Sequence, residues 1–202
     1  MLITFEGIDL AGKTTQVQLL AKYLINKGLN VVTLREPGGT EIAEKIREIL
    51  LKPSNELNPF TEFFLFEAAR SDLVTKVIKP LVNKGITVIC DRFWDSTIAY
   101  QGYGRGLPLD LVEKCNFYAS GGIEPQLTFL LDIPLEIMFE RARKKTTDRM
   151  ENETTDYLLR VVNGFRELAN KFPNRIIVIN GTSSIEEIHK EVIEVVKDKL
   201  KV

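Results

Sequence analysis

The sequence predicts an α/β protein built on a five-stranded parallel sheet that is doubly wound by helices. Short apolar runs alternate with helical segments along all 202 residues, a pattern typical of strands joined by helical crossovers. The run ITVIC (86–90) is apolar throughout, as expected of a strand buried on both faces. Candidate chemical residues directly follow three of the runs, where ligands gather in such folds. The length suits one domain, which we expect to span 1–202.

Five short segments rich in apolar and β-branched residues are predicted as strands. In order, they are LITF (2–5), NVVTL (30–34), ITVIC (86–90), LTFLL (127–131) and RIIVI (175–179). A loop-rich stretch is expected after the third strand. The predicted helices cover 13–27, 41–51, 58–78, 109–119, 134–144, 154–172 and the segment after Ser184.

Local signals support several of these helix boundaries. Gly28 closes the first helix, and Asn58 can cap the long helix that Pro59 starts and that ends or kinks near Pro80. Ser184 and Glu187 form a capping-box pattern. The apolar residues of the final helix recur at helical spacing, at Ile185, Ile188, Val192, Val195 and Leu200.

Charge and cysteine content restrict the function classes. With 27 basic and 28 acidic residues the net charge is −1, so no overall field favours nucleic acid or a membrane surface. Cys90 and Cys115 are too few for a disulfide framework and indicate a reducing compartment. We see no signal peptide in MLITFEG and no apolar run of roughly 20 residues. We therefore expect a cytoplasmic protein without nucleic-acid or membrane partners.

The stretch GIDLAGKTT (7–15) fits the phosphate-binding pattern G-x-x-x-x-G-K-[ST]. Lys13 is expected to reach the β- and γ-phosphates of a nucleotide, and the Thr14 hydroxyl to ligate Mg²⁺. A chance match is the alternative, but the pattern lies between a strand and an amphipathic helix, as the motif requires. The predicted ATP-binding residues are Gly7, Ile8, Asp9, Leu10, Ala11, Gly12, Lys13, Thr14 and Thr15.

Other motif residues indicate a metal and a second anion site. Asp91 ends the third strand, where a carboxylate can hold the water shell of Mg²⁺; a strand-end turn or cap is the alternative. Arg35 in REPGGT and Arg92 in DRFWDSTIAYQG follow the second and third predicted strands. No guanine-reading N-K-x-D segment is found. A donor and an acceptor phosphate site together indicate a nucleotide kinase.

Phe66 and Arg70 lie four residues apart in FEAAR, on one helical face. An aromatic ring beside a guanidinium can stack on a base and hydrogen-bond its edge. Core packing is the alternative for Phe66. For Arg70 the alternative is a buried ion pair with Glu67 or another carboxylate.

GIDLAGKTTQ, REPGGT, FEAAR and DRFWDSTIAYQG, in this order, resemble the motifs of the thymidylate kinase family across essentially the whole chain. The resemblance implies the P-loop kinase fold with a short helical lid near 141–152. It also implies transfer of the γ-phosphate of ATP to dTMP, a Mg²⁺ cofactor and a homodimer. A related kinase with another nucleoside or nucleoside monophosphate as acceptor, or a nucleotide-binding regulator that does not catalyse, are the alternatives.

The resemblance also assigns roles to individual residues. Asp9 would bind near the 3′-hydroxyl of the acceptor, with an outward-facing side chain as the alternative. The implied acceptor-binding residues are Asp9, Arg35 and Arg92 for phosphate and sugar, Phe66 and Arg70 for thymine, Tyr100 against a 2′-hydroxyl, and Ser96, Thr97 and Gln101 near the base.

A catalytic arginine remains to be placed. In the family it follows the acidic residue of the phosphate loop or comes from the lid; here the loop position is Leu10. The resemblance therefore implies a lid residue, Arg143, Lys145 or Arg149, and places Arg141 at the adenine. The alternative for this basic segment is the solvated end of an exposed helix. The predicted catalytic set is Asp9, Lys13, Arg92, Arg143 and Arg149.

Overall fold

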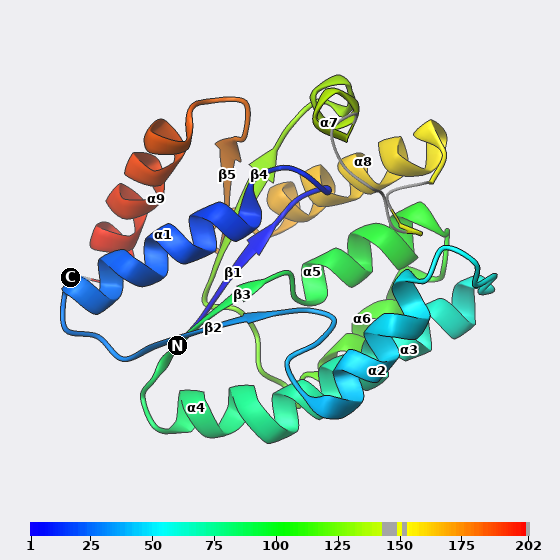
Figure 1. The fold of residues 1–202 in the computed structure, drawn as a ribbon, viewed down its shortest axis with the longest axis horizontal. Coiled ribbons are helices and arrows are strands. Elements are labelled where there is room, and N and C mark those ends of the chain that lie inside the picture. Colours follow the sequence, from blue (N-terminus) through cyan, green and yellow to red (C-terminus); the bar gives the residue numbers. More distant parts are fainter. Residues whose placement is uncertain (143–148, 151–152, 201–202) are drawn as a thin grey trace.

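The computed structural model describes residues 1–142, 149–150 and 153–200, and its centre is a five-stranded parallel sheet of order β2-β3-β1-β4-β5. This confirms the predicted parallel α/β architecture, here with helices on both sides of the sheet (Figure 1). The strands are β1 (Leu2–Glu6), β2 (Val31–Arg35), β3 (Thr87–Asp91), β4 (Leu127–Asp132) and β5 (Ile176–Asn180).

Helices α1 and α9 pack together on one side of the sheet, while α3, α6 and α8 lie on the other (Figure 1). The α-helices are α1 (Lys13–Asn26), α2 (Glu41–Leu51), α3 (Pro59–Leu73), α4 (Lys79–Asn83), α5 (Trp94–Thr97), α6 (Leu109–Ala119), α7 (Leu135–Ala142), α8 (Thr155–Lys171) and α9 (Ile185–Leu200). Two π-helical segments, η1 (Val74–Ile78) and η2 (Ile98–Gly104), complete the helical elements of the described residues.

The predicted helix caps at two helices are confirmed. The Asn58 side chain accepts a hydrogen bond from the Thr61 amide at 2.9 Å, with Pro59 in the first turn of α3. At α9, the Ser184 hydroxyl accepts from the Glu187 amide and the Glu187 carboxylate accepts from the Ser184 amide. Both helix starts therefore arise from local hydrogen bonding.

One sequence-based detail is wrong. The stretch after β3 is helical, through α5 and η2, rather than loop-rich. The helix predicted to end or kink near Pro80 runs through η1 into α4, which ends at Asn83. The π-helical segment η1 shifts the hydrogen-bond register, with the Lys79 amide donating to the Val74 carbonyl, and Pro80 lies in the first turn of α4.

The register of the central strands brings three motifs to one edge of the sheet. Phe5 of β1 pairs with Asp91 of β3, and Arg35 of β2 pairs with the same Asp91. The three strands therefore end at the same edge of the sheet, and the residues that follow them, Gly7, Glu36 and Arg92, are near neighbours. No helix of the described residues is long and apolar enough to cross a membrane.

Candidate active site

A cavity of ≈ 680 Å³ opens at this edge of the sheet and is lined by most of the residues predicted from the motifs. They come from the phosphate loop, from the ends of β2 and β3, and from α3, α5, η2 and α7. The predicted residues that line it are Asp9, Leu10, Gly12, Lys13, Thr14, Thr15, Arg35, Phe66, Arg70, Asp91, Arg92, Ser96, Thr97, Tyr100, Gln101 and Arg141. Donor-type and acceptor-type motifs therefore share one cavity.

The phosphate loop takes a backbone shape that needs glycine at its start. Gly7 has φ 129°, and a Cβ there would lie 2.5 Å from the Leu131 carbonyl oxygen. Gly12, with φ 98°, precedes α1, and the first residues of that helix line the cavity, so its N-terminus lies at the cavity. Ile8 and Ala11 are buried and pack in the core. Like Gly7, they belong to the loop but do not line the cavity.

Lys13 is buried in the loop, where its Nζ donates to the Ile8 carbonyl at 2.8 Å. Burial, reinforced by the Arg92 guanidinium, lowers the pKa of Lys13 to about 8. A phosphate group entering the loop would raise this pKa again and offer the ammonium a stronger acceptor than the carbonyl.

Thr14 and Asp91 meet at the N-terminus of α1. The Thr14 hydroxyl donates to Asp91 Oδ2 at 2.5 Å. No group of three or more His, Cys, Asp or Glu side chains that could hold a metal occurs among the described residues. Two hard oxygen donors without a full protein cage fit Mg²⁺, which keeps several water ligands and takes the rest from phosphates.

Asp9 faces Arg92 and Tyr100 across the cavity. Arg92 has a left-handed backbone, with φ 70°, and its guanidinium lies 2.5 Å from Asp9 Oδ1 while also donating to the Gly7 carbonyl at 2.9 Å. The Tyr100 hydroxyl lies 3.2 Å from Asp9 Oδ2. Burial alone would raise the pKa of Asp9, but Arg92 and Lys13 hold it below its usual value. Asp9 is therefore an ionised carboxylate directed at Arg92 rather than at solvent.

A buried carboxylate that sequence reasoning missed, Glu6, supports the turn after β3. Its two oxygens accept from the Phe93 amide at 2.7 Å and from the Ser96 hydroxyl at 2.5 Å. Ser96 in turn accepts from Arg92 at 3.0 Å. Burial and the nearby Asp95 raise the pKa of Glu6 to about 8. The one sequence signal that could have indicated this role is the position of Glu6 at the end of β1, directly before the phosphate loop.

Phe66 and Arg70 of α3 also line the cavity. Phe66 is half-buried and lines the cavity, so it is not a fully packed core residue. Arg70 is only 2% exposed and is paired with Glu36 at 2.8 Å and Glu67 at 2.6 Å. The predicted ion pair with Glu67 is thus present, although Arg70 also lines the cavity.

Glu36 and Asn116 complete this environment and were not found from the sequence. Asn116 Oδ1 accepts from Arg70 at 2.6 Å. Burial, only partly offset by Arg70, raises the pKa of Glu36 to about 7. The second Glu36 oxygen, Oε1, is buried and has no hydrogen-bond partner among the described residues.

Comparison with known proteins decides the family. The family model described as thymidylate kinase matches residues 5–192. The chain belongs to the thymidylate kinase family. It is 47% identical to a thymidylate kinase of Prosthecochloris aestuarii, over 98% of this chain and 94% of the relative, and 46% identical to that of Kosmotoga olearia, over 96% and 94%. The crystal structure of thymidylate kinase from Ehrlichia chaffeensis superimposes with a TM-score of 0.80, at 39% identity over 97% of this chain and 98% of that chain.

Two further residues expected to contact nucleotides in a thymidylate kinase lie at the rim of the cavity. Arg35 is 52% exposed at its side chain and pairs with Glu44 at 3.0 Å. Arg141 bridges the phosphate loop and the β5–α9 turn, since it donates to the Leu10 carbonyl at 2.8 Å and to the Gly181 carbonyl at 3.2 Å.

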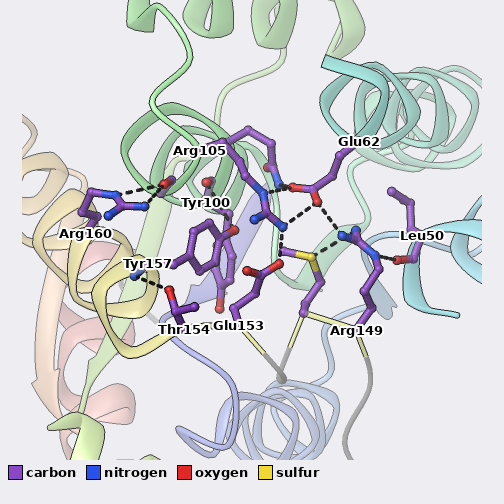
Figure 2. Close-up of polar contacts among 12 residues, drawn as sticks. Leu50, Glu62, Tyr100, Arg105, Arg149, Glu153, Thr154, Tyr157 and Arg160 are labelled. Carbon is purple, nitrogen blue, oxygen red and sulfur yellow. Dashed lines mark hydrogen bonds and ion pairs between the residues drawn. The ribbon is translucent and has the colours of Figure 1, made fainter. Parts of the chain in front are cut away.

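Of the lid residues expected to catalyse transfer, Arg149 is described by the structure, and its contacts lie away from the phosphate loop. Arg143 and Lys145 lie outside the described residues. Arg149 does not line the cavity: its guanidinium lies 2.8 Å from Glu62 and donates to the Leu50 carbonyl at 2.6 Å (Figure 2). Glu62, 0% exposed, is another buried carboxylate that the sequence did not reveal.

Proposed function

We propose that the chain transfers the γ-phosphate of ATP to dTMP, giving ADP and dTDP. One observation carries this proposal: a single cavity contains both the phosphate loop, at Lys13, and the aromatic–guanidinium pair formed by Phe66 and Arg70. Phosphoryl transfer needs donor and acceptor held together, with positive charge at the moving group. Membership of the thymidylate kinase family supports dTMP as the acceptor.

At the donor end, the loop amides and Lys13 hold the ATP phosphates, with Arg141 beside the adenine. Thr14 and Asp91 hold Mg²⁺, partly through water, and the ion supplies charge neutralisation on the phosphates when it is bound. Their 2.5 Å contact supports this assignment, because it brings a hydroxyl at the start of α1 together with a carboxylate at the end of β3.

At the acceptor end, Arg92 and Arg35 hold the phosphate of dTMP, and Asp9 keeps Arg92 in place while contacting the sugar. Phe66 stacks on thymine and Arg70 reaches its exocyclic oxygen. Ser96, Thr97 and Gln101 lie beside the base, and the Tyr100 ring takes the space that a 2′-hydroxyl would need. The Asp9–Arg92–Tyr100 contacts support this arrangement, since they fix three groups around one point of the cavity.

The catalytic arginine belongs to the basic segment near 141–152. Arg143 remains a prediction for this role, because it lies outside the described residues. Arg149 has a different set of contacts in this structure, which we take up below.

A homodimer and a cytoplasmic location complete the proposal. Helices α3 and α6 contact each other and carry large exposed apolar side chains, namely Phe60, Phe64, Phe117 and Tyr118. Exposed apolar side chains on two contacting helices suit a self-complementary interface. Both cysteines are free thiols, which supports a reducing compartment. Sedimentation of the chain and of a Phe64→Ser variant tests the dimer, which the variant should weaken.

The acceptor is tested by ADP release in a coupled assay across dTMP, dUMP, UMP, CMP, AMP and thymidine. We expect the highest kcat/KM for dTMP. A preference for any other acceptor would overturn the assignment.

A further inference from the structure

Glu62 is the centre of a buried polar cluster that reaches the cavity through Gln101. This Glu62 cluster comes from α3, η2, the residue after η2 and the chain that precedes α8, and consists of Glu62, Gln101, Arg105, Arg149 and Glu153. Figure 2 shows Arg105 and Arg149 converging on Glu62 from opposite sides. Neither the predicted catalytic set nor the predicted acceptor site explains why a carboxylate is buried here.

The contacts of Glu62 account for its burial. Arg105 contacts it through Nε at 3.1 Å and through a second nitrogen at 2.8 Å, and Arg149 lies 2.8 Å away. Arg105 also pairs with Glu153 and lies over the Tyr157 ring at 4.3 Å. Two carboxylates therefore balance two guanidinium groups. Burial opposes ionisation, but these partners hold the pKa of Glu62 below its usual value.

An ionised Glu62 dictates how Gln101 is oriented. Gln101 is 1% exposed, lines the cavity and donates its Nε2 to Glu62 Oε1 at 2.8 Å. A carboxylate without a proton can only accept, so the nitrogen of the amide must face Glu62. The amide oxygen is thereby directed away from Glu62 and is the acceptor available for other contacts.

Arg149 is fully engaged within this cluster. Its Nε donates to the Leu50 carbonyl at 2.6 Å, one terminal nitrogen pairs with Glu62, and the other contacts the Met150 sulfur at 3.3 Å. Its amide also donates to the Leu51 carbonyl at 3.3 Å. Leu51 and Met150 both line the cavity. Arg149 thus holds together the C-terminal end of α2, the Glu62 carboxylate of α3 and the part of the cavity wall formed by Leu51 and Met150.

We propose that Glu62 and Arg149 are positioning residues for the acceptor base: Glu62 sets the Gln101 amide, and Arg149 secures Glu62 and the Leu51–Met150 wall. Arg149 acts in dTMP binding and not at the transferring phosphate. The inference rests on the proposed function, because it assumes that the base lies beside Gln101.

The test measures dTMP binding by calorimetry without ATP, together with kcat at saturating dTMP, for Glu62→Gln, Arg149→Met and the double variant. In Glu62→Gln, one of the two carboxylate oxygens is replaced by an NH₂ group, which donates a hydrogen bond. The Gln101 amide is then no longer held in one orientation, so the substitution should raise the dTMP Kd about 10- to 100-fold. Arg149→Met, which keeps the packing volume of the stem, should raise it about 5- to 10-fold. The ATP Kd should stay within twofold and kcat should fall less than tenfold. The double variant should bind dTMP no more than about twofold worse than Glu62→Gln, as expected of one unit.

Arg160→Met is the matched control. Arg160 donates to the Gly104 carbonyl of η2 at 2.9 Å, as Figure 2 shows, and is not a member of the Glu62 cluster. Its dTMP Kd should match that of the unmodified chain. If Glu62→Gln does not fold, Arg149→Met and Arg149→Lys decide, and the lysine, which keeps the charge, should restore most of the affinity.

An unchanged dTMP Kd in folded variants overturns the proposal. So does a loss of 10³ or more in kcat for Arg149→Met, which is the size expected of an arginine at the transferring phosphate. Failure of the unmodified chain to bind dTMP would instead contradict the proposed function, so the two failures are distinguishable.

Discussion

Replacing Asp9 with asparagine tests the acceptor side of the site most specifically. The substitution keeps the shape of the side chain but removes the charge that faces Arg92 at 2.5 Å and Tyr100 at 3.2 Å. A hydrogen bond to a charged group is worth about 1.5–3 kcal/mol, and at about 1.4 kcal/mol per tenfold change this corresponds to roughly 10- to 100-fold. We expect kcat/KM for dTMP to fall by this factor, because Arg92 loses the carboxylate that orients it.

The assay is steady-state ADP release with dTMP varied at saturating ATP, paired with ATP binding measured without dTMP. The ATP Kd should stay within about threefold. Asp110→Asn is the control, since within the described part of the chain the Asp110 side chain forms an exposed ion pair with Lys114 at 3.6 Å, and pairs of this kind contribute little. An equal loss of ATP affinity, or no loss of kcat/KM for dTMP, would refute the acceptor-side role of Asp9.

Four other perturbations have defined outcomes. Arg70→Ala leaves buried carboxylates unpaired and should cost about 3–5 kcal/mol of unfolding free energy, measured by urea denaturation; a loss below about 1 kcal/mol contradicts the buried-pair account. The pKa of Lys13 is lowered to about 8, and ATP binds the protonated form, so ATP affinity should fall as pH rises above 8; a flat profile from pH 7 to 9.5 would count against this. Gly7→Ala forces a Cβ to within 2.5 Å of a backbone oxygen at φ 129°, so ATP binding should be lost in any folded protein, and retained binding would disprove the strain. Thr14→Val should raise the Mg²⁺ concentration for half-maximal activity about tenfold or more, whereas an unaltered titration would remove Thr14 from the metal site.

The strands and the edge at which the cavity opens were predictable because both depend on local patterns. The continuous apolar run 86–90 indicates by itself a strand that is buried on both faces. A phosphate loop between a strand and a helix likewise has a geometry that its own residues determine. Parallel pairing then places Arg35 and Asp91 side by side, since each ends its strand. These residues could be assigned to one site before any contact was known.

The buried carboxylates Glu6, Glu36 and Glu62 could not be found in this way. An isolated glutamate in a sequence most often faces solvent, and each of these is buried only because partners distant in the sequence supply donors or positive charge. Glu62, for example, depends on Arg105 and Arg149. The π-helical turn at 98–104 was missed for a related reason: its glycines resemble loop residues, yet Gly102 and Gly104 lie where a Cβ would meet side chains at 2.7 and 2.8 Å.

The central claim is that one cavity joins ATP to dTMP for direct transfer. The most direct measurement is a single-turnover reaction with ATP labelled at the γ-phosphate, excess enzyme, Mg²⁺ and dTMP. The account predicts that the label appears in dTDP in the same amount as ADP is formed. Formation of ADP with the label in inorganic phosphate, or ATP binding without turnover, would contradict it.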